Sequence, residues 1–156
     1  MTMPHRRRLA LALATAALGW TVPARASDEP EADPGLLARL RRVESAFRQS
    51  DANSLRLSFT DAGKMRVDIK DLTDGQETYG AGQLQVIFAH IFQGFRTQDF
   101  HFGKDGVKVS NPRTAFARGR WTRRYRPDGQ EAVDTLIFTL QEDDGDWRIL
   151  EIRSAR

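Results

Sequence analysis

Two segments of the chain repeat their apolar residues with the spacing of an amphipathic helix. In the first, Leu36, Leu40, Val43 and Phe47 recur at i, i+4, i+7 and i+11, which places them on one helical face. Pro34 suits the first turn of such a helix, because the N–H that proline lacks has no partner there. The pattern therefore predicts a helix over 36–47 that packs through one face.

The second segment predicts a helix over 84–95. Gly80 lies just before it and is an accepted N-cap residue, although weaker than serine or aspartate. The apolar stripe consists of Leu84, Ile87, Phe88, Ile91, Phe92 and Phe95. A short additional helix over 53–59 fits the pattern between the two segments.

Most of the remaining chain alternates apolar and polar residues with period two, which is typical of half-buried strands. The predicted strands cover 65–69, 99–102, 113–126, 131–142 and 147–154. The order is helix, short helix, short strand, helix, and then only strands joined by tight turns. We therefore expect one α+β domain over 35–156, with helices packed on one face of a curved antiparallel sheet.

A strong turn signal at 127–130, Pro-Asp-Gly-Gln, sets the expected register of the two long strands. A two-residue turn at 128–129 places Trp121 opposite Leu136 on the core face. It also places Arg123 opposite Asp134 near the hairpin tip. Asp134 is therefore a candidate catalytic acid, and the competing interpretation is an ion pair with Arg123 at the rim of the core.

The last strand has two possible registers. A two-residue turn at 144–145 would direct Ile149 and Glu151 toward the core. A three-residue turn at 144–146 directs Leu150 and Ile152 there instead. We favour the second, because an unpaired buried carboxylate costs several kcal/mol. Ile149 then joins Val133 and Ile137 on the outer face of the sheet, and these apolar residues predict a homodimer through that face.

The first 26 residues have the three parts of an export signal: arginines at 6–8, an apolar run over 9–22 and the small-x-small site Ala-Arg-Ala at 24–26. As a helix the run would measure about 21 Å, less than the roughly 30 Å of bilayer hydrocarbon. We expect cleavage after Ala26 and a periplasmic or secreted mature chain without a membrane span. Either the general secretory or the twin-arginine route fits the arginines.

Removal of this segment changes the charge of the chain. The full chain has a formal net charge of +3, but the signal contains four arginines and no acidic residue, so 20 basic and 21 acidic residues remain. We therefore expect no nucleic-acid partner. Residues 27–34 are acidic and contain proline, which predicts a disordered leader.

The residue types limit the possible chemistry. The chain has no cysteine, its two mature histidines are eleven residues apart, and no metal-binding, nucleophile-elbow or phosphate-loop motif is present, so we expect neither a metal nor a cofactor. Asp99 and His101 lie two apart on one predicted strand and could form a general base with its orienting partner. In the competing interpretation Phe100 and Phe102 face the core, and the polar pair faces solvent.

Three stretches carry a resemblance to a known superfamily: "VESAFRQSDANSLRLSF", "ETYGAGQLQVIFAHIFQGF" and "DGDWRILEIRS". Over about 35–154 the chain resembles the nuclear-transport-factor-2-like (cystatin-like) superfamily, which includes ketosteroid isomerase, scytalone dehydratase and polyketide cyclases. It looks most like small secreted bacterial members of unassigned function, although Tyr79-Gly80 stands where those tend to have Tyr-Ser. The resemblance implies a cone-shaped cavity, whose lining we expect to include Phe88, Phe92, Trp121 and Phe138.

These observations favour a secreted, non-catalytic domain that binds a small apolar ligand or serves in association. The alternative is an isomerase, cyclase or dehydratase that uses Asp99 with His101, or Asp134, in the cone cavity. A purely structural dimerisation module is a third interpretation.

Overall fold

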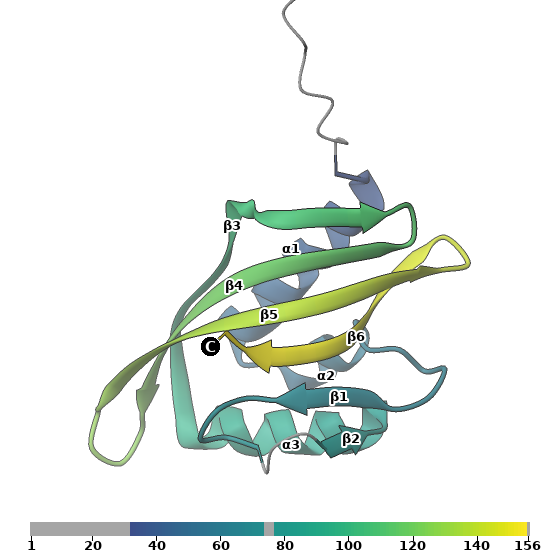
Figure 1. Cartoon of the computed structure of the whole chain (residues 1–156). Helices are drawn as coiled ribbons and strands as arrows, with labels where there is room; N and C mark the ends of the chain where they lie inside the picture. Colours follow the sequence, from purple (N-terminus) through teal and green to yellow (C-terminus); the bar gives the residue numbers. More distant parts are fainter. Residues whose placement is uncertain (1–31, 74–76, 156) are drawn as a thin grey trace, which may run out of the picture.

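A six-stranded sheet forms one layer of the molecule, and the helices lie on one of its faces (Figure 1). The computed structural model describes residues 32–73 and 77–155. The helices are α1 (Pro34–Gln49), α2 (Ala52–Arg56) and α3 (Ala81–Gly94). The strands are β1 (Met65–Asp68), β2 (Glu77–Tyr79), β3 (Phe95–Asn111), β4 (Thr114–Tyr125), β5 (Glu131–Asp143) and β6 (Asp146–Ser154). This is the predicted α+β fold.

The sheet is curved and open, with the strand order β2-β1-β6-β5-β4-β3. Consecutive long strands are antiparallel, as expected, but β1 and β6 are parallel, so the sheet is mixed. The parallel pair arises because the last strand lies between β5 and β1. The short strand β2, of three residues, was not predicted, since three residues give no measurable alternation.

Helix α1 begins where the sequence indicates. Asp33 is its N-cap and accepts a hydrogen bond from the Gly35 N–H at 2.7 Å, and Pro34 occupies the first turn. The helix ends at Ser50, whose φ of 54° is left-handed. The four predicted apolar residues, Leu36, Leu40, Val43 and Phe47, are all buried. The last two residues assigned to the leader, 33 and 34, thus belong to the folded domain.

Helix α3 has Gly80 as its N-cap, as predicted, and the Gln83 side chain accepts a hydrogen bond from the Gly80 N–H at 2.9 Å. The helix ends one residue early, at Gly94, because Phe95 is already extended and begins β3. The predicted short helix is confirmed as α2. None of the helices in the described part of the chain combines the length and apolar character that a membrane crossing requires. The predicted signal, residues 1–26, lies outside the described residues.

The predicted register of β4 and β5 is wrong by two residues. Trp121 pairs with Asp134, and Leu136 pairs with Gly119, because the connection is longer than two residues. The Tyr125 N–H donates to the Gln130 carbonyl at 2.8 Å, so four residues form the loop. A shift of two leaves every side chain on its predicted face, since the strand period is two.

The last hairpin combines the two registers that the sequence left open. The turn has two residues, at 144–145, and Leu140 pairs with Ile149. A β-bulge at Leu150 then shifts the register by one residue, so that Phe138 pairs with Ile152 and Glu151 faces away from the core. Ile149 is fully buried, and its predicted place on the outer face is wrong. The bulge lets both isoleucines reach the core without burying the carboxylate.

The core is an aromatic cluster centred on Phe47 of α1. Its ring stacks on Phe100 at a centroid distance of 4.2 Å and contacts four further rings at 5.3 to 6.1 Å. Those four are Phe88, Phe92, Trp121 and Phe138. Gly119 belongs to this packing, because a Cβ there would lie 2.6 Å from the Phe100 ring. The cluster joins α1 and α3 to the sheet.

Candidate ligand-binding groove

A groove of about 1010 Å³ runs between α1 and the second half of β3. Its apolar surface comes from Leu37 and Leu40 on the helix and from Phe102, Val107 and Val109 on the strand. All but Leu40 are partly exposed. The groove therefore offers apolar surface to a ligand without any movement of the backbone.

The groove exists because β3 bends sharply in its middle (Figure 1). Between Phe102 and Val107 the pairing with β4 is interrupted: β3 advances five residues while β4 advances only from Gly119 to Ala117. Gly106 lies in this bulge, and a Cβ there would be 2.9 Å from the Arg118 carbonyl oxygen. Glycine thus allows the bulge to fold closely against β4, and the strand beyond it diverges from its first direction.

Charged side chains form the rim of the groove on both sides. Arg41 and Glu44 come from α1, and Lys104, Asp105 and Lys108 come from β3. Glu44 also fixes the two elements together, because its Oε1 accepts a hydrogen bond from the Phe102 N–H at 2.7 Å. The rim thus has three cations and two carboxylates, one of them already engaged.

The residues predicted to line a cone cavity lie elsewhere. Phe88, Trp121 and Phe138 are fully buried and pack against Phe47, which occupies the centre of the cone. Phe92 is nearly buried and borders a separate recess of about 530 Å³ beside Arg126. Their role in ligand binding stays a prediction, and it would require displacement of the Phe47 ring.

Asp99 and His101 lie close together but in solvent. The His101 Nδ1 is 2.7 Å from the Asp99 carboxylate, and the two side chains are 46% and 50% exposed. Hydrogen bonding to His101 lowers the pKa of Asp99, and the charges of His101 and Arg48 act in the same direction. Phe100 is buried and Phe102 is partly buried against the core, where it borders the groove, so the polar pair faces solvent as expected.

Asp134 forms the predicted ion pair with Arg123, at 2.7 Å between its Oδ2 and the arginine Nε. The two residues are not directly opposite, since Asp134 pairs with Trp121, but they share the core face. The guanidinium lies over the Phe95 ring, 4.3 Å from its centroid. Both side chains are largely buried, with exposed fractions of 7% and 17%. The carboxylate is therefore engaged and does not border the α1–β3 groove.

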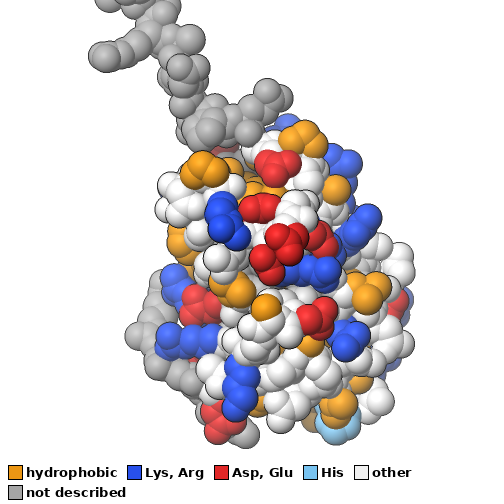
Figure 2. All heavy atoms as spheres, turned by 90° about the vertical axis from the view of Figure 1, so that its right-hand side faces the viewer, with side chains coloured by type: hydrophobic (Ala, Val, Ile, Leu, Met, Phe, Trp, Pro, Cys, Tyr) orange, Lys and Arg blue, Asp and Glu red, His pale blue; other side chains and the backbone are white. Residues whose placement is uncertain are grey.

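Acidic side chains gather at the end of the molecule that carries the β5–β6 turn (Figure 2). Asp61, Asp143, Asp144 and Asp146 border a hollow of about 510 Å³ there, together with Arg148. Among residues 32–73 and 77–155, no three His, Asp or Glu side chains are arranged to hold a metal ion.

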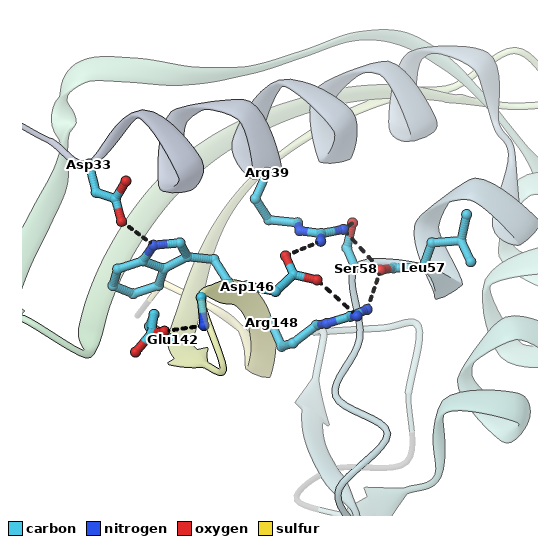
Figure 3. Close-up of polar contacts among 9 residues, drawn as sticks. Asp33, Arg39, Leu57, Ser58, Glu142, Asp146 and Arg148 are labelled. Atoms are coloured by element: carbon cyan, nitrogen blue, oxygen red, sulfur yellow. Dashed lines mark hydrogen bonds and ion pairs between the residues drawn. The ribbon is translucent and has the colours of Figure 1, made fainter.

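Much of this charge belongs to a structural network (Figure 3). Arg39 of α1 is only 5% exposed, donates to the Leu57 carbonyl at 2.9 Å and forms an ion pair with Asp146. Arg148 contacts the other Asp146 oxygen at 2.9 Å and the same carbonyl at 2.7 Å. One carboxylate and one carbonyl thus join α1, the segment after α2 and the start of β6.

This network predicts an acid-sensitive contribution to stability. Burial alone would raise the pKa of Asp146, but the hydrogen bond from Arg39 and the nearby arginine charges lower it overall. A carboxyl whose pKa is lower in the folded chain stabilises it above the unfolded value, near 3.8, and loses this effect as the pH falls through the folded value. Urea unfolding between about pH 6 and pH 3 should show a smaller loss of stability for Asp146→Asn than for the unmodified protein.

The control for this prediction is Asp143→Asn, which removes a neighbouring exposed acid outside the network. It should keep the acid sensitivity of the unmodified protein. Equal pH dependence in Asp146→Asn and the unmodified protein would contradict the assignment.

The sequence pattern does not indicate the groove. Val107-Lys108-Val109 is a short alternating run, and Gly103 and Gly106 mark a possible irregularity before it. Neither signal indicates that the strand would bend toward the exposed edge of α1.

No protein-family model and no curated protein sequence matches the chain. Solved structures do match in fold. A DUF4783 family protein from Bacteroides uniformis ATCC 8492 has a TM-score of 0.60 at 13% identity, over 74% of this chain and 94% of that one. A ketosteroid isomerase-like protein from Erwinia carotovora atroseptica SCRI1043 has a TM-score of 0.60 at 16% identity, over 77% and 92%.

An NTF-2-like protein of unknown function from Shewanella oneidensis MR-1 is similar over 78% of this chain and 97% of its own, with a TM-score of 0.58 and 13% identity. At such identities the likeness concerns the fold and carries no activity with it. The chain has the nuclear-transport-factor-2-like, or cystatin-like, fold that its sequence pattern predicts.

Proposed function

We propose that the mature chain is an exported, non-catalytic domain that binds a small apolar ligand in the groove between α1 and β3. The groove itself carries this proposal, because its volume is about 1010 Å³, its lining is largely apolar, and charged groups lie at its rim. Ligand sites in proteins are typically concave, mostly apolar and furnished with a few polar groups, with volumes of roughly 300–1,000 Å³. The groove has this character.

Export is the second part of the proposal. It rests on the basic, apolar and small-residue parts of 1–26, and it gives a mature chain that begins at Ser27 in the periplasm or outside the cell. The protein would then bind its ligand outside the cytoplasm.

Association into a homodimer is the third part. The outer face of the sheet carries Val133 and Phe116, which are 48% and 40% exposed, and the half-buried Ile137 lies between them. Phe116 lies on this face, whereas Ile149, which was predicted there, is buried in the core. Arg118 and Arg120 lie among these apolar residues, and apolar side chains on an uncovered sheet face favour contact with a second copy.

The acid–base enzyme is the less favoured alternative. Asp99 and His101 are half exposed, and Asp134 is held by Arg123. None of the three lines the groove. A general acid or base acts within hydrogen-bond reach of a bound substrate, which these positions do not provide.

Native mass spectrometry of the protein purified from its own host tests all three parts at once. We expect a chain that begins at Ser27, a two-copy complex and an added mass that organic extraction removes. A chain that begins at Met1 would contradict export. A single-copy species at tens of micromolar would exclude the dimer, and a protein without retained or rebound ligand would remove the support for binding.

A further inference from the structure

The shape of the groove favours an elongated ligand. Its α1 wall extends from Leu37 to Glu44, about 10 Å along the helix. Its β3 wall extends from Phe102 to Val109, which pair with Gly119 and Ala115 of β4, four residues or about 13 Å apart. The apolar residues lie along these walls. A compact ring system would contact only part of this surface, whereas an aliphatic chain could follow it.

The charges at the rim favour an acidic headgroup. Arg41 approaches from α1, and Lys104 and Lys108 approach from β3. Within the described residues, none of these three cations forms an ion pair. Glu44 keeps its negative charge at this rim, although its Oε1 also accepts a hydrogen bond from the Phe102 N–H. Glu44 and Asp105 offset two of the three positive charges, so the rim keeps a net charge of +1.

Resting on the ligand-binding function proposed above, we infer that the groove binds a single-chain acidic amphiphile, an aliphatic carboxylate or phosphate monoester. The chain lies against the apolar side chains of α1 and β3. The headgroup lies between Arg41, Lys104 and Lys108, where charge-assisted hydrogen bonds replace part of its hydration. An amphiphile with a neutral or cationic headgroup lacks this second interaction.

Three ligands with the same chain test the headgroup: dodecanoate, dodecanol and dodecylamine, each below its aggregation limit, with dodecyl phosphate as a further arm. They are titrated against the mature protein by displacement of the neutral probe N-phenyl-1-naphthylamine. At low salt we expect dodecanoate to bind about tenfold more tightly than dodecanol, and dodecylamine more weakly than either. Salt should reduce this difference, because the cations are exposed. Dodecyl phosphate and dodecanoate differ only in headgroup, and the tighter of them identifies the preferred acid.

The variant Lys104→Glu/Lys108→Glu should bind dodecanoate about tenfold more weakly and dodecanol within about twofold of the unmodified protein. The matched control, Lys64→Glu/Lys70→Glu, makes the same charge change at two exposed lysines that do not border the groove, and it should leave both affinities unchanged. All four positions are exposed, so neither variant should unfold.

The results separate the two proposals. If N-phenyl-1-naphthylamine and dodecanol do not bind, the ligand-binding function itself is wrong. If they bind but dodecanoate gains nothing over dodecanol, or keeps its gain in Lys104→Glu/Lys108→Glu, only the acidic headgroup is wrong. The acidic segment 27–31 offers another occupant: tight dodecanoate binding that appears only in Asp28→Asn/Glu29→Gln/Glu31→Gln would assign the groove to that segment and overturn the proposal.

Discussion

Phe47→Ala is expected to lower the free energy of unfolding by about 3–5 kcal/mol, the range for removal of a buried phenylalanine ring. Phe47 is fully buried and contacts five other aromatic rings. The neighbours come from α3 and three strands, so they can collapse into the vacated space only in part. Urea unfolding measures the loss.

The same variant should acquire a binding site that the unmodified protein does not have. The rings around the vacated space include Phe88, Phe92, Trp121 and Phe138, the residues that the sequence predicts to line a cone cavity. An apolar cavity of this origin stays dry and accepts a small aromatic molecule. Benzene or indole should therefore raise the melting temperature of Phe47→Ala and leave the unmodified protein unchanged.

Two further variants sharpen this test. Phe47→Leu keeps most of the volume and should lose less stability than Phe47→Ala and bind no benzene. Leu57→Ala removes a side chain that is 62% exposed and should change stability by less than about 0.5 kcal/mol. If Phe47→Ala lowers the free energy of unfolding by less than about 1 kcal/mol, or if benzene does not raise its melting temperature, the Phe47 ring does not fill the cone as described.

The apolar pattern was sufficient to predict the faces of the elements but not their register. Trp121, Phe138 and Leu140 lie on the core face as predicted, although β4 and β5 are shifted by two residues. The Asp128-Gly129 signal indicates a turn without specifying its length, and turns of two and four residues place the same side chains inward.

Ile149 shows the opposite case, in which one extra residue in the strand decides whether a side chain lies on the core face or on the outer face. Burial of Ile149 and of Ile152 requires one extra residue between them, and the bulge at Leu150 provides it. A regular strand has no such position, so the sequence offered two exclusive registers where the structure uses each over part of the strand.

The groove could not be predicted for a related reason. It depends on a bulge of β3 near Gly106 and on the distance between that strand and α1, which are properties of long-range packing. On a regular strand, the same residues would show the sequence pattern of an exposed edge strand. Local pattern therefore located the core, whereas the candidate site lies where the chain departs from the pattern.

Asp134→Ala is expected to cost about 3–5 kcal/mol, because it would leave the Arg123 guanidinium without its partner in a largely buried place. Arg123 is 7% exposed and Asp134 17%, with 2.7 Å between the paired atoms. Such a pair is more buried than its predicted position near the hairpin tip implies. The loss should be smaller in Asp134→Asn, whose amide oxygen can still accept from the arginine Nε.

A double-mutant cycle separates this interaction from the other contacts of the two side chains. Arg123→Met with Asp134→Leu should lose much less than the two single changes added together, with a coupling of about 2 kcal/mol in urea unfolding.

The exposed pair Arg124–Glu131 is the control for this cycle. It lies in the same hairpin at 3.6 Å with both side chains about half exposed, and its coupling should stay below about 1 kcal/mol. Equal coupling in the two cycles would mean that burial does not strengthen the Arg123–Asp134 pair. A coupling near zero, together with a ligand-binding or turnover defect in a stably folded Asp134→Asn variant, would instead give Asp134 a functional role, because a purely structural carboxylate should affect ligand binding only through the stability of the fold.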